Sequence, residues 1–422
     1  MMNIKIGKST LKGKVKVISS KSDAHRLLIA AALAHIPTKI WIEGWSNDME
    51  ATKNCLEALG CKIARGEGVV EVTPLWEEQS KAVVLDCVES GSTLRFLIPI
   101  VAALGKQAIV EGQGRLPERP LGVLLDELRK HGCQVKEDTL PLEMGGGITG
   151  GIYTLPGNIS SQFITGLLFA LPLLQEDSEI RLSTIIESRG YIDMTLETLE
   201  TFGIQIDERD WGFFIKGGQT YRSPREVSAE GDWSGAAFWV VGGGVGGDIT
   251  CTGLRKDSCQ GDMEIVSLME EFGSKVQWQV DGVHVSGGAL KGIKIDGAQI
   301  PDLVPILCTA AALAQGTTEI YNAGRLRIKE SDRLKAMAEG LGKLGVKVTE
   351  QPEGILIEGG NIPPAGEVIL DSYDDHRIVM ALAIAAAALG VEAVIERAEA
   401  VSKSYPTFFA EFIRLGGVAD VF

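Results

Sequence analysis

The sequence predicts an α/β protein of two lobes, each built from three copies of one repeat of about 71 residues. The chain has 422 residues, the length of about two ordinary domains. Glycine accounts for 51 of them, about 12% against a usual 7%. A helical pattern, a glycine and then an alternating strand pattern recur six times along the chain. Repeats of this length with mixed elements favour layered α/β lobes rather than a solenoid.

The regular spacing of the recurring glycine is the evidence for the repeat. Successive intervals are 72, 71, 70, 72 and 71 residues, for Gly60, Gly132, Gly203, Gly273, Gly345 and Gly416. Each glycine ends an amphipathic helical pattern, as in LEALGCKI and LETFGIQI. This position is typical of a helix C-terminus, where the next residue adopts a positive φ that glycine tolerates.

Each repeat also contains an earlier helical segment, rich in Ala, Leu and Val, whose composition predicts complete burial. These helices are expected to begin at short polar segments, at Ser22, Gly91, Ser161, Asp232, Asp302 and Asp375. A strand is expected after each, at residues 38–43, 107–111, 178–183, 247–252, 317–321 and 391–396. The predicted order is therefore helix, strand, helix, strand, turn, strand.

The repeats are expected to group into an N-terminal lobe, residues 16–229, and a C-terminal lobe, residues 1–15 with 230–422. The segment 222–230, RSPREVSAE, is the expected hinge. Residues 1–15 have a strand pattern but no repeat of their own, so they are expected to complete the last one. Two chain crossings between lobes would permit a cleft that closes on a ligand.

Charge and composition exclude several classes of protein. The formal net charge is -15, which disfavours a nucleic-acid or membrane-surface partner. The longest apolar helical run, 378–391, is too short to cross a bilayer, and the N-terminus lacks a signal-peptide core. Seven cysteines show no metal-ligand spacing and are expected to be reduced. We therefore expect a cytoplasmic protein.

Several of the polar helix starts carry basic residues. A helix N-terminus has free N–H groups and about half a positive charge, so it suits anions. N-capping alone explains a Ser or Asp there. Capping does not explain Lys21, Arg26, Arg95 or Arg377, because a cation opposes the helix dipole unless it faces an anion. The pattern predicts phosphate or carboxylate binding.

Ten segments in order make the chain similar to the 5-enolpyruvylshikimate-3-phosphate synthase family. They are SSKSDAHR (19–26), ESGSTLRF (89–96), GRLPERP (114–120), SSQFITGLL (160–168), ESRGYIDMT (187–195), EGDWS (230–234), IPDLVPI (300–306), IKESDRL (328–334), DDHRIVMALA (374–383) and SKSYPTFF (402–409). The family's fold is the two-lobed enolpyruvyl transferase fold, three α/β repeats per lobe. This agrees with the repeat counted independently.

The resemblance implies transfer of the enolpyruvyl group of phosphoenolpyruvate to the 5-hydroxyl of 3-phosphoshikimate, with release of phosphate. It implies no metal and no organic cofactor, and we expect a monomer. Phosphoenolpyruvate is expected to meet Lys21, Gly91, Arg119, Gln162, Arg333, Arg377 and Lys403. 3-Phosphoshikimate is expected to meet Lys21, Ser22, Arg26, Ser160, Ser161, Gln162, Ser188, Tyr191, Asp302 and Lys329.

The chemistry requires a base for the hydroxyl and an acid for the methylene carbon, with both transfers reversed during elimination. By resemblance Asp302 takes the hydroxyl proton, although as an isolated residue it is explained as an N-cap. Glu330 and Lys21 are both candidates for the acid, and Glu330 needs a raised pKa for that role. His376 is a further candidate site residue.

Some positions depart from the family pattern. Glu89 stands where the family often has Asn, Ser92 replaces Thr, and Arg325 with Leu326 replaces an Asn-Trp pair.

Two rival functions remain to be distinguished by experiment. The sister transferase acting on UDP-N-acetylglucosamine shares the fold, but typically has a loop Cys where this chain has RLPERP. A silent binding protein would be favoured by loss of Lys21, Asp302, Glu330 or Lys403, all of which are present.

Overall fold

The computed structural model describes residues 2–74, 82–362, 364 and 366–422, and the chain divides into two compact lobes. The N-terminal lobe is Lys21–Ala229, and the C-terminal lobe joins Met1–Ser20 to Glu230–Phe422. The first crossing therefore lies at residues 20 and 21. The reason is that strand β2 (Lys12–Lys16) pairs with β15 (Asp248–Thr252) of the C-terminal lobe.

The described residues form six four-stranded sheets with one common strand order. In the second repeat, β6 (Val83–Asp86) runs parallel to β7 (Ala108–Glu111). Strand β7 then pairs antiparallel with β9 (Leu142–Gly145), whose other edge holds β8 (Gln134–Val135). The other five sheets repeat this arrangement of two parallel strands followed by an antiparallel pair, which in the last sheet consists of β1 and β24 from opposite ends of the chain. The sixfold repeat in the sequence thus corresponds to six copies of one supersecondary unit.

The N-terminal lobe holds repeats 1 to 3. Repeat 1 consists of α1 (Lys21–Leu33), β3 (Thr38–Trp41), α2 (Asn47–Ala58), β4 (Lys62–Arg65), β5 (Val69–Thr73) and the distant β14 (Glu226–Ser228). Repeat 2 adds α3 (Gly91–Ala103), the 3-10 turn η1 (Leu116–Glu118) and α4 (Gly122–Lys130) to its sheet. Repeat 3 consists of β10 (Gly151–Leu155), α5 (Ser161–Ala170), η2 (Leu171–Leu173), β11 (Ser178–Leu182), α6 (Arg189–Thr201), β12 (Ile206–Arg209) and β13 (Gly212–Ile215).

The C-terminal lobe holds repeats 4 to 6. Repeat 4 consists of β2, α7 (Trp233–Gly244), β15, η3 (Gly261–Glu264), α8 (Ile265–Phe272), β16 (Lys275–Gln279) and β17 (Gly282–Ser286). Repeat 5 consists of β18 (Lys294–Asp296), α9 (Val304–Leu313), β19 (Thr317–Tyr321), η4 (Gly324–Ile328), α10 (Arg333–Lys343), β20 (Val346–Gln351) and β21 (Gly354–Asn361). Repeat 6 consists of β22 (Val368–Asp371), α11 (His376–Leu389), β23 (Ala393–Glu396), η5 (Ala398–Lys403), α12 (Phe408–Arg414), β24 (Val418–Val421) and β1 (Ile4–Gly7).

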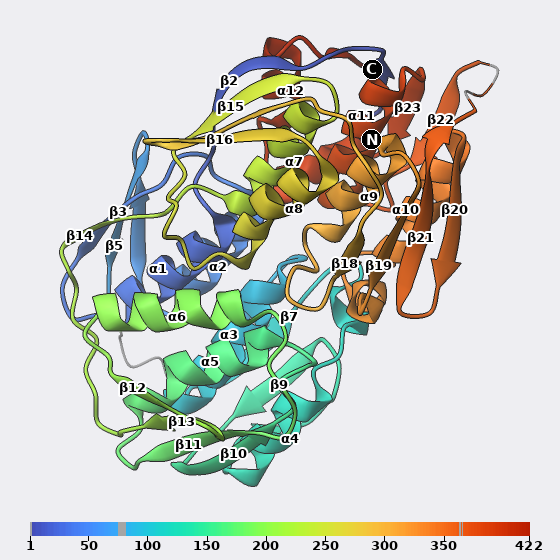
Figure 1. The fold of residues 1–422 in the computed structure, drawn as a ribbon. Helices are drawn as coiled ribbons and strands as arrows, with labels where there is room; N and C mark the ends of the chain where they lie inside the picture. The colour runs from blue at the N-terminus through green and yellow to red at the C-terminus, as the bar shows by residue number, and fades with distance from the viewer. Residues whose placement is uncertain (1, 75–81, 363, 365) are drawn as a thin grey trace. The chain divides into compact units, whose positions relative to one another are not determined.

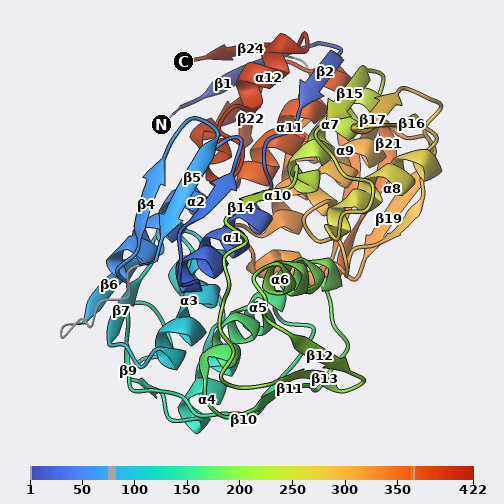
Figure 2. The ribbon, with the colours of Figure 1, turned by 90° about the vertical axis from the view of Figure 1, so that its left-hand side faces the viewer.

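Three strands are supplied from outside the sequence of their repeat, as can be followed in Figure 1 and Figure 2. Strand β1 lies between β23 and β24, so the N-terminal segment does complete the last repeat as expected. Strand β2 is the outer strand of repeat 4, and β14 is the outer strand of repeat 1. Because β14 is reached only after repeat 3, the N-terminal lobe is closed by its own last segment.

The first helix of each repeat forms the core of its lobe. Helices α1, α3 and α5 are almost wholly buried in the N-terminal lobe, and α7, α9 and α11 are likewise buried in the other. Their Ala-, Leu- and Val-rich composition leaves no polar face, which explains the burial. The second helix of each repeat is followed by the recurring glycine, and all six glycines have positive φ, from 76° to 111°. The predicted glycine role is thereby confirmed.

Candidate active site

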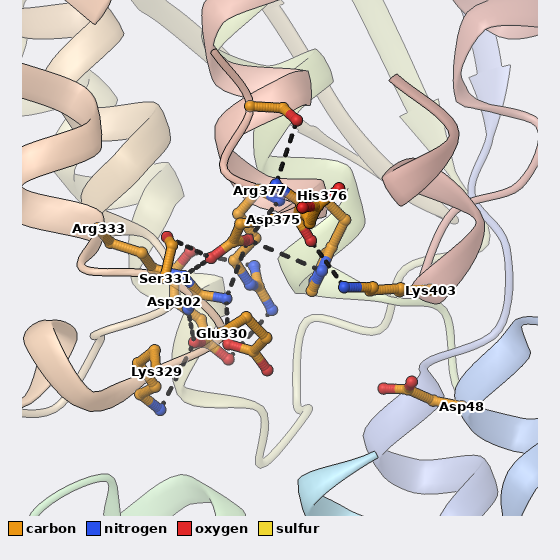
Figure 3. A network of polar contacts seen from close by, with 12 residues as sticks. Asp48, Asp302, Lys329, Glu330, Ser331, Arg333, Asp375, His376, Arg377 and Lys403 are labelled. Carbon is orange, nitrogen blue, oxygen red and sulfur yellow. Dashed lines mark hydrogen bonds and ion pairs between the residues drawn. The ribbon is translucent and has the colours of Figure 1, made fainter. Parts of the chain in front are cut away.

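The C-terminal lobe contains a buried arginine that is shared by three carboxylates (Figure 3). Arg333, the first residue of α10, is 1% exposed. Its Nη1 donates to Asp302 Oδ1 at 2.9 Å, and its Nη2 donates to Glu330 Oε2 at 2.7 Å. Its Nε donates to Asp375 Oδ2 at 2.8 Å. Burial opposes the charge, but these carboxylates raise the pKa of Arg333 above its ordinary value.

Asp302 is the carboxylate on which the other cations converge. Arg377 Nη2 donates to Asp302 Oδ2 at 3.0 Å, and Arg377 Nη1 donates to the Asp302 carbonyl at 3.0 Å. Lys329 Nζ lies 3.9 Å from Asp302 Oδ1. Burial lowers the pKa of Lys329 to about 8, and the pull of Asp302 offsets this only in part. Three cations thus lie within 4 Å of the Asp302 carboxylate.

The N-cap role considered for Asp302 is wrong. Helix α9 begins at Val304, and its N-cap is Leu303 without a side-chain cap bond. Asp302 therefore precedes the helix, and its carboxylate accepts hydrogen bonds from Arg333 and Arg377.

Asp375 links the start of α11 to the same cluster. As N-cap it accepts from Arg377 N at 3.0 Å, and it also accepts from Ser331 Oγ at 3.0 Å. Burial opposes ionisation, but Arg333 and then His376 bring the pKa of Asp375 below its ordinary value. His376 is buried, with Nδ1 3.8 Å from Asp375 Oδ1.

Lys403, at the end of η5, donates to the Asp374 carbonyl at 2.6 Å. It therefore lies at the turn that leads into Asp375 and α11.

A further carboxyl group, Asp262 on η3, lies near Asp302. It is 4% exposed and accepts a hydrogen bond from Ser234 Oγ. Burial and then the charge of Asp302 raise the pKa of Asp262 to about 6, while Arg377 opposes the shift.

In the N-terminal lobe, two guanidinium groups lie over Gly91. Helix α3 begins at Gly91 after the N-cap Ser90, which accepts from Thr93 N at 3.2 Å. A Cβ added to Gly91 would lie 2.7 Å from both Arg95 Nη1 and Arg119 Nη1. A side chain here would therefore push both guanidinium groups away from their present positions.

Gln162 joins the starts of α3 and α5. Arg95 Nη1 donates to Gln162 Oε1 at 3.0 Å, and Gln162 Nε2 donates to Ser92 Oγ at 3.0 Å. Ser160 is the N-cap of α5 and accepts from Gln162 N at 3.3 Å, while Ser161 is the first helical residue and is buried.

The start of α1 contributes a second group of cations. Arg26 is 2% exposed and donates to Thr195 Oγ1 at 2.9 Å, the Ser22 carbonyl at 2.6 Å and the Tyr191 carbonyl at 2.7 Å. Burial lowers the pKa of Arg26 to about 10, and nearby Asp23 and Tyr191 offset this only in part.

Lys21 and Ser188 complete the expected residues of this lobe. Lys21, the first residue of α1, forms an ion pair with Asp48 at 2.7 Å. Ser188 is buried, has a φ of 57° and precedes α6, whose first turn carries Tyr191.

The structure brings the expected residues of the C-terminal lobe together around Asp302, and it places those of the N-terminal lobe at the starts of α1, α3, α5 and α6. In the C-terminal lobe Arg333 and Arg377 both meet Asp302. Sequence reasoning did not assign Asp48 or Asp262, and it named Asp375 beside a helix start without giving it a role. For Asp375 the signal was its place in DDHR, whereas Asp48 lies in an ordinary helix start where an acidic residue is unremarkable.

Neither a metal cluster nor a membrane span is found in the described part of the chain. No three or more His, Cys, Asp or Glu residues among those described are grouped to hold a metal ion. None of the described helices combines the length and apolar character needed to cross a bilayer.

Comparison with known proteins identifies the family. The sequence model of EPSP synthase (3-phosphoshikimate 1-carboxyvinyltransferase) matches residues 6–412. The 3-phosphoshikimate 1-carboxyvinyltransferases of Clostridium kluyveri and Clostridium acetobutylicum are each 43% identical, over 100% and 98% of this chain and 99% and 97% of theirs. The EPSP synthase of Acinetobacter baumannii superimposes with a TM-score of 0.82, at 27% identity and full coverage of both chains. This chain therefore belongs to the EPSP synthase family.

Proposed function

We propose that this enzyme transfers the enolpyruvyl group of phosphoenolpyruvate to the 5-hydroxyl of 3-phosphoshikimate and releases phosphate. The observation that carries the assignment to these residues is the Asp302 carboxylate, which lies 2.9 Å from Arg333 and 3.0 Å from Arg377. A base, Asp302, thus lies within hydrogen-bond distance of two anion-binding guanidinium groups, those of Arg333 and Arg377. That combination suits a hydroxyl that must attack a carbon bearing a phosphate and a carboxylate.

The substrate contacts are assigned by chemistry. Phosphoenolpyruvate binds Lys21, Gly91, Arg119, Gln162, Arg333, Arg377 and Lys403, most of which are cationic or lie at a helix start. 3-Phosphoshikimate binds Lys21, Ser22, Arg26, Ser160, Ser161, Gln162, Ser188, Tyr191, Asp302 and Lys329. Glycine at position 91 supports close approach of an anion, because its backbone is not shielded by a side chain.

The reaction is an addition followed by an elimination. Asp302 accepts the proton of the 5-hydroxyl as its oxygen bonds to the substituted carbon of the enol, and the methylene carbon receives a proton. The adduct then loses a proton from the methyl group and the phosphate leaves. Glu330 and Lys21 are the two candidates for the carbon acid: Glu330 accepts from Arg333, and Lys21 is ion-paired with Asp48.

The test is phosphate release from phosphoenolpyruvate in chelator-treated buffer, with 3-phosphoshikimate or UDP-N-acetylglucosamine as the acceptor. We expect turnover with 3-phosphoshikimate only. Turnover with the nucleotide sugar only would replace the assignment by that of the sister transferase. Absence of turnover with both, in a folded sample, would indicate a binding protein.

The proposal also covers the location, the oligomeric state and the partners of the protein. We expect a cytoplasmic monomer whose partners are its two small substrates. The net charge of -15 disfavours a nucleic-acid or membrane partner. Light scattering after gel filtration checks the monomer, and a mass of twice 45.2 kDa would contradict it.

A further inference from the structure

Two loops of repeat 2 are joined by hydrogen bonds near the ends of strands β6 and β7. We call them the Gly91 loop, residues 86–91, and the Arg119 loop, residues 111–119. Cys87 N donates to the Glu111 carbonyl at 3.0 Å, and Gln113 N donates to the Val88 carbonyl. Gln113 Nε2 also donates to Asp86 Oδ2 at 3.2 Å. These bonds hold the loops together where they leave β6 and β7.

Beyond these bonds, each loop places a charged side chain over a glycine of the other. Arg119 of the Arg119 loop lies over Gly91, where an added Cβ would be 2.7 Å from Nη1. Glu89 of the Gly91 loop lies over Gly114, where an added Cβ would be 2.2 Å from Oε1 and 2.9 Å from Cδ. Gly114 has a φ of +56°, in the left-handed region that favours glycine. Because glycine has no side chain, the Glu89 carboxylate can lie against its backbone.

We propose that Glu89 is a positioning residue: its side chain, lying against Gly114, holds the Arg119 loop so that the Arg119 guanidinium stays over Gly91. Glu89 does not touch the substrate in this role. The inference rests on the proposed function in one respect, that Arg119 and Gly91 bind phosphoenolpyruvate. The loop geometry itself is independent of that assignment.

Positioning and simple electrostatics predict opposite effects of removing Glu89. A carboxylate near an anion site repels the anion, so its loss alone would tighten phosphoenolpyruvate binding. If Glu89 holds the loop, its loss releases Arg119 and weakens binding, although a negative charge has been removed. The direction of the change therefore distinguishes the two explanations.

The kinetic test uses Glu89→Ala, Glu89→Gln and the control Glu118→Gln. Glu118 lies in the Arg119 loop and pairs with Arg115 in solvent, at 3.3 Å. We expect Glu89→Ala to raise the KM for phosphoenolpyruvate about tenfold, the size of one lost charge-assisted contact, with kcat within about twofold. Gln keeps the reach of Glu, so Glu89→Gln should restore a KM near that of the wild type, and Glu118→Gln should leave it unchanged.

Three kinetic results would overturn the proposal. These are an unchanged or lower KM in Glu89→Ala, a Glu89→Gln variant as impaired as Glu89→Ala, or an equal rise in Glu118→Gln. The last result would mean that loss of a negative charge from either loop raises the KM equally.

A second readout does not depend on turnover. Hydrogen exchange of peptides covering residues 111–119 should be faster in Glu89→Ala than in the wild type, because the loop is released. Exchange should be unchanged in Glu118→Gln. Equal exchange in Glu89→Ala and the wild type would overturn the positioning role even in a protein inactive with the proposed substrates. An inactive wild type with the expected exchange would instead contradict only the proposed function.

Discussion

Arg26 and Arg333 are buried to nearly the same extent, 2% and 1% exposed, yet their pKa values shift in opposite directions. Arg26 donates to a hydroxyl and two carbonyl groups, which satisfy its N–H groups without neutralising its charge. Burial therefore prevails and lowers the pKa of Arg26 to about 10. Arg333 donates to three carboxylates, which outweigh its burial and raise its pKa.

The difference indicates two kinds of anion site. A buried cation with neutral partners retains an electrostatic demand that an anionic substrate can meet. A buried cation among carboxylates is already balanced, and its contribution is to fix the geometry of those carboxylates. The start of α1 in the N-terminal lobe thus suits anion binding alone, whereas Arg333, which we propose to bind phosphoenolpyruvate, also holds a proton-accepting group such as Asp302 in place.

The largest effect is expected from Asp302→Asn, which keeps the shape of the side chain and removes its basicity. We expect kcat to fall by about 10²- to 10⁴-fold, the usual contribution of a general base. Steady-state kinetics at saturating substrates measure the loss, and thermal unfolding verifies the fold. The isosteric Asp332→Asn, at the N-cap of α10, is the control and should keep kcat within a fewfold. A kcat for Asp302→Asn within threefold of the wild type would remove Asp302 from catalysis.

The next largest effect is a difference between the two arginines in the free energy of unfolding that their loss costs. Arg333→Met leaves Asp302, Glu330 and Asp375 without their common partner, which should cost about 3–5 kcal/mol in free energy of unfolding. Arg26→Met leaves only neutral acceptors unpaired and should cost about 1–3 kcal/mol. Urea titrations compare them, with the exposed Arg209→Met as a control expected within about 0.5 kcal/mol. If Arg26→Met proved as costly as Arg333→Met, the contrast drawn from their partners would be wrong.

Lys329 provides a pH test within the balanced cluster. Its pKa of about 8 means that the ammonium is lost from the folded state above that pH. The KM for 3-phosphoshikimate should therefore rise about fivefold from pH 8 to pH 9, as expected for one titrating group. Lys329→Arg should abolish this rise, because a guanidinium stays charged. A rise that persists in Lys329→Arg would assign the titration to another group.

The same shift predicts the sign of a change in stability. The unfolded chain keeps its lysine protonated up to about pH 10.5, so between pH 8 and that value it binds more protons than the folded chain. The free energy of unfolding should consequently rise with pH across this window, and it should do so less in Lys329→Arg. Urea titrations of both proteins at pH 8 and pH 9.5 check this. Equal slopes would contradict the lowered pKa.

Local rules were enough to predict most of the fold. The six positive-φ glycines and the buried helices follow from spacing and apolar composition, which act within about 15 residues. The strand at 317–321 agrees with β19 to the residue, and the N-terminal strand joins the last repeat. The exchange of β14 into repeat 1 was not predicted, because a three-residue strand of EVS carries no pattern and its partner lies about 190 residues away.

The sequence predicted which residue types form the site, but not which residues they contact. Cations beside helix starts were visible because they oppose the helix dipole. That Arg333 serves three carboxylates on separate elements, or that Lys21 pairs with Asp48, depends on long-range packing that no local pattern encodes. Asp302 was interpreted as a cap from its position alone, and tertiary contacts with two arginines determine its actual orientation.

The last expected effect concerns the packing of two helices beneath the N-terminal site. In the N-terminal lobe, Arg95 on α3 meets Gln162 on α5 because the two helices pack closely at Gly166. A Cβ at Gly166 would lie 2.3 Å from the Arg95 carbonyl and 3.0 Å from Pro99 Cγ. Gly166→Ala should therefore force the helices apart and cost about 1–3 kcal/mol in free energy of unfolding.

Gly122→Ala at the start of α4 is the matched control, because nothing lies within 4 Å of its added Cβ. It should be neutral or stabilising by up to about 1 kcal/mol, since alanine is the better helix former. Gly166→Ala should also raise the KM for phosphoenolpyruvate severalfold, because Arg95 and Gln162 would separate. Unchanged KM with reduced stability would show that the anion site does not depend on this helix contact. The N-terminal site would then resemble the Arg333 cluster, whose geometry is fixed by its own ion pairs.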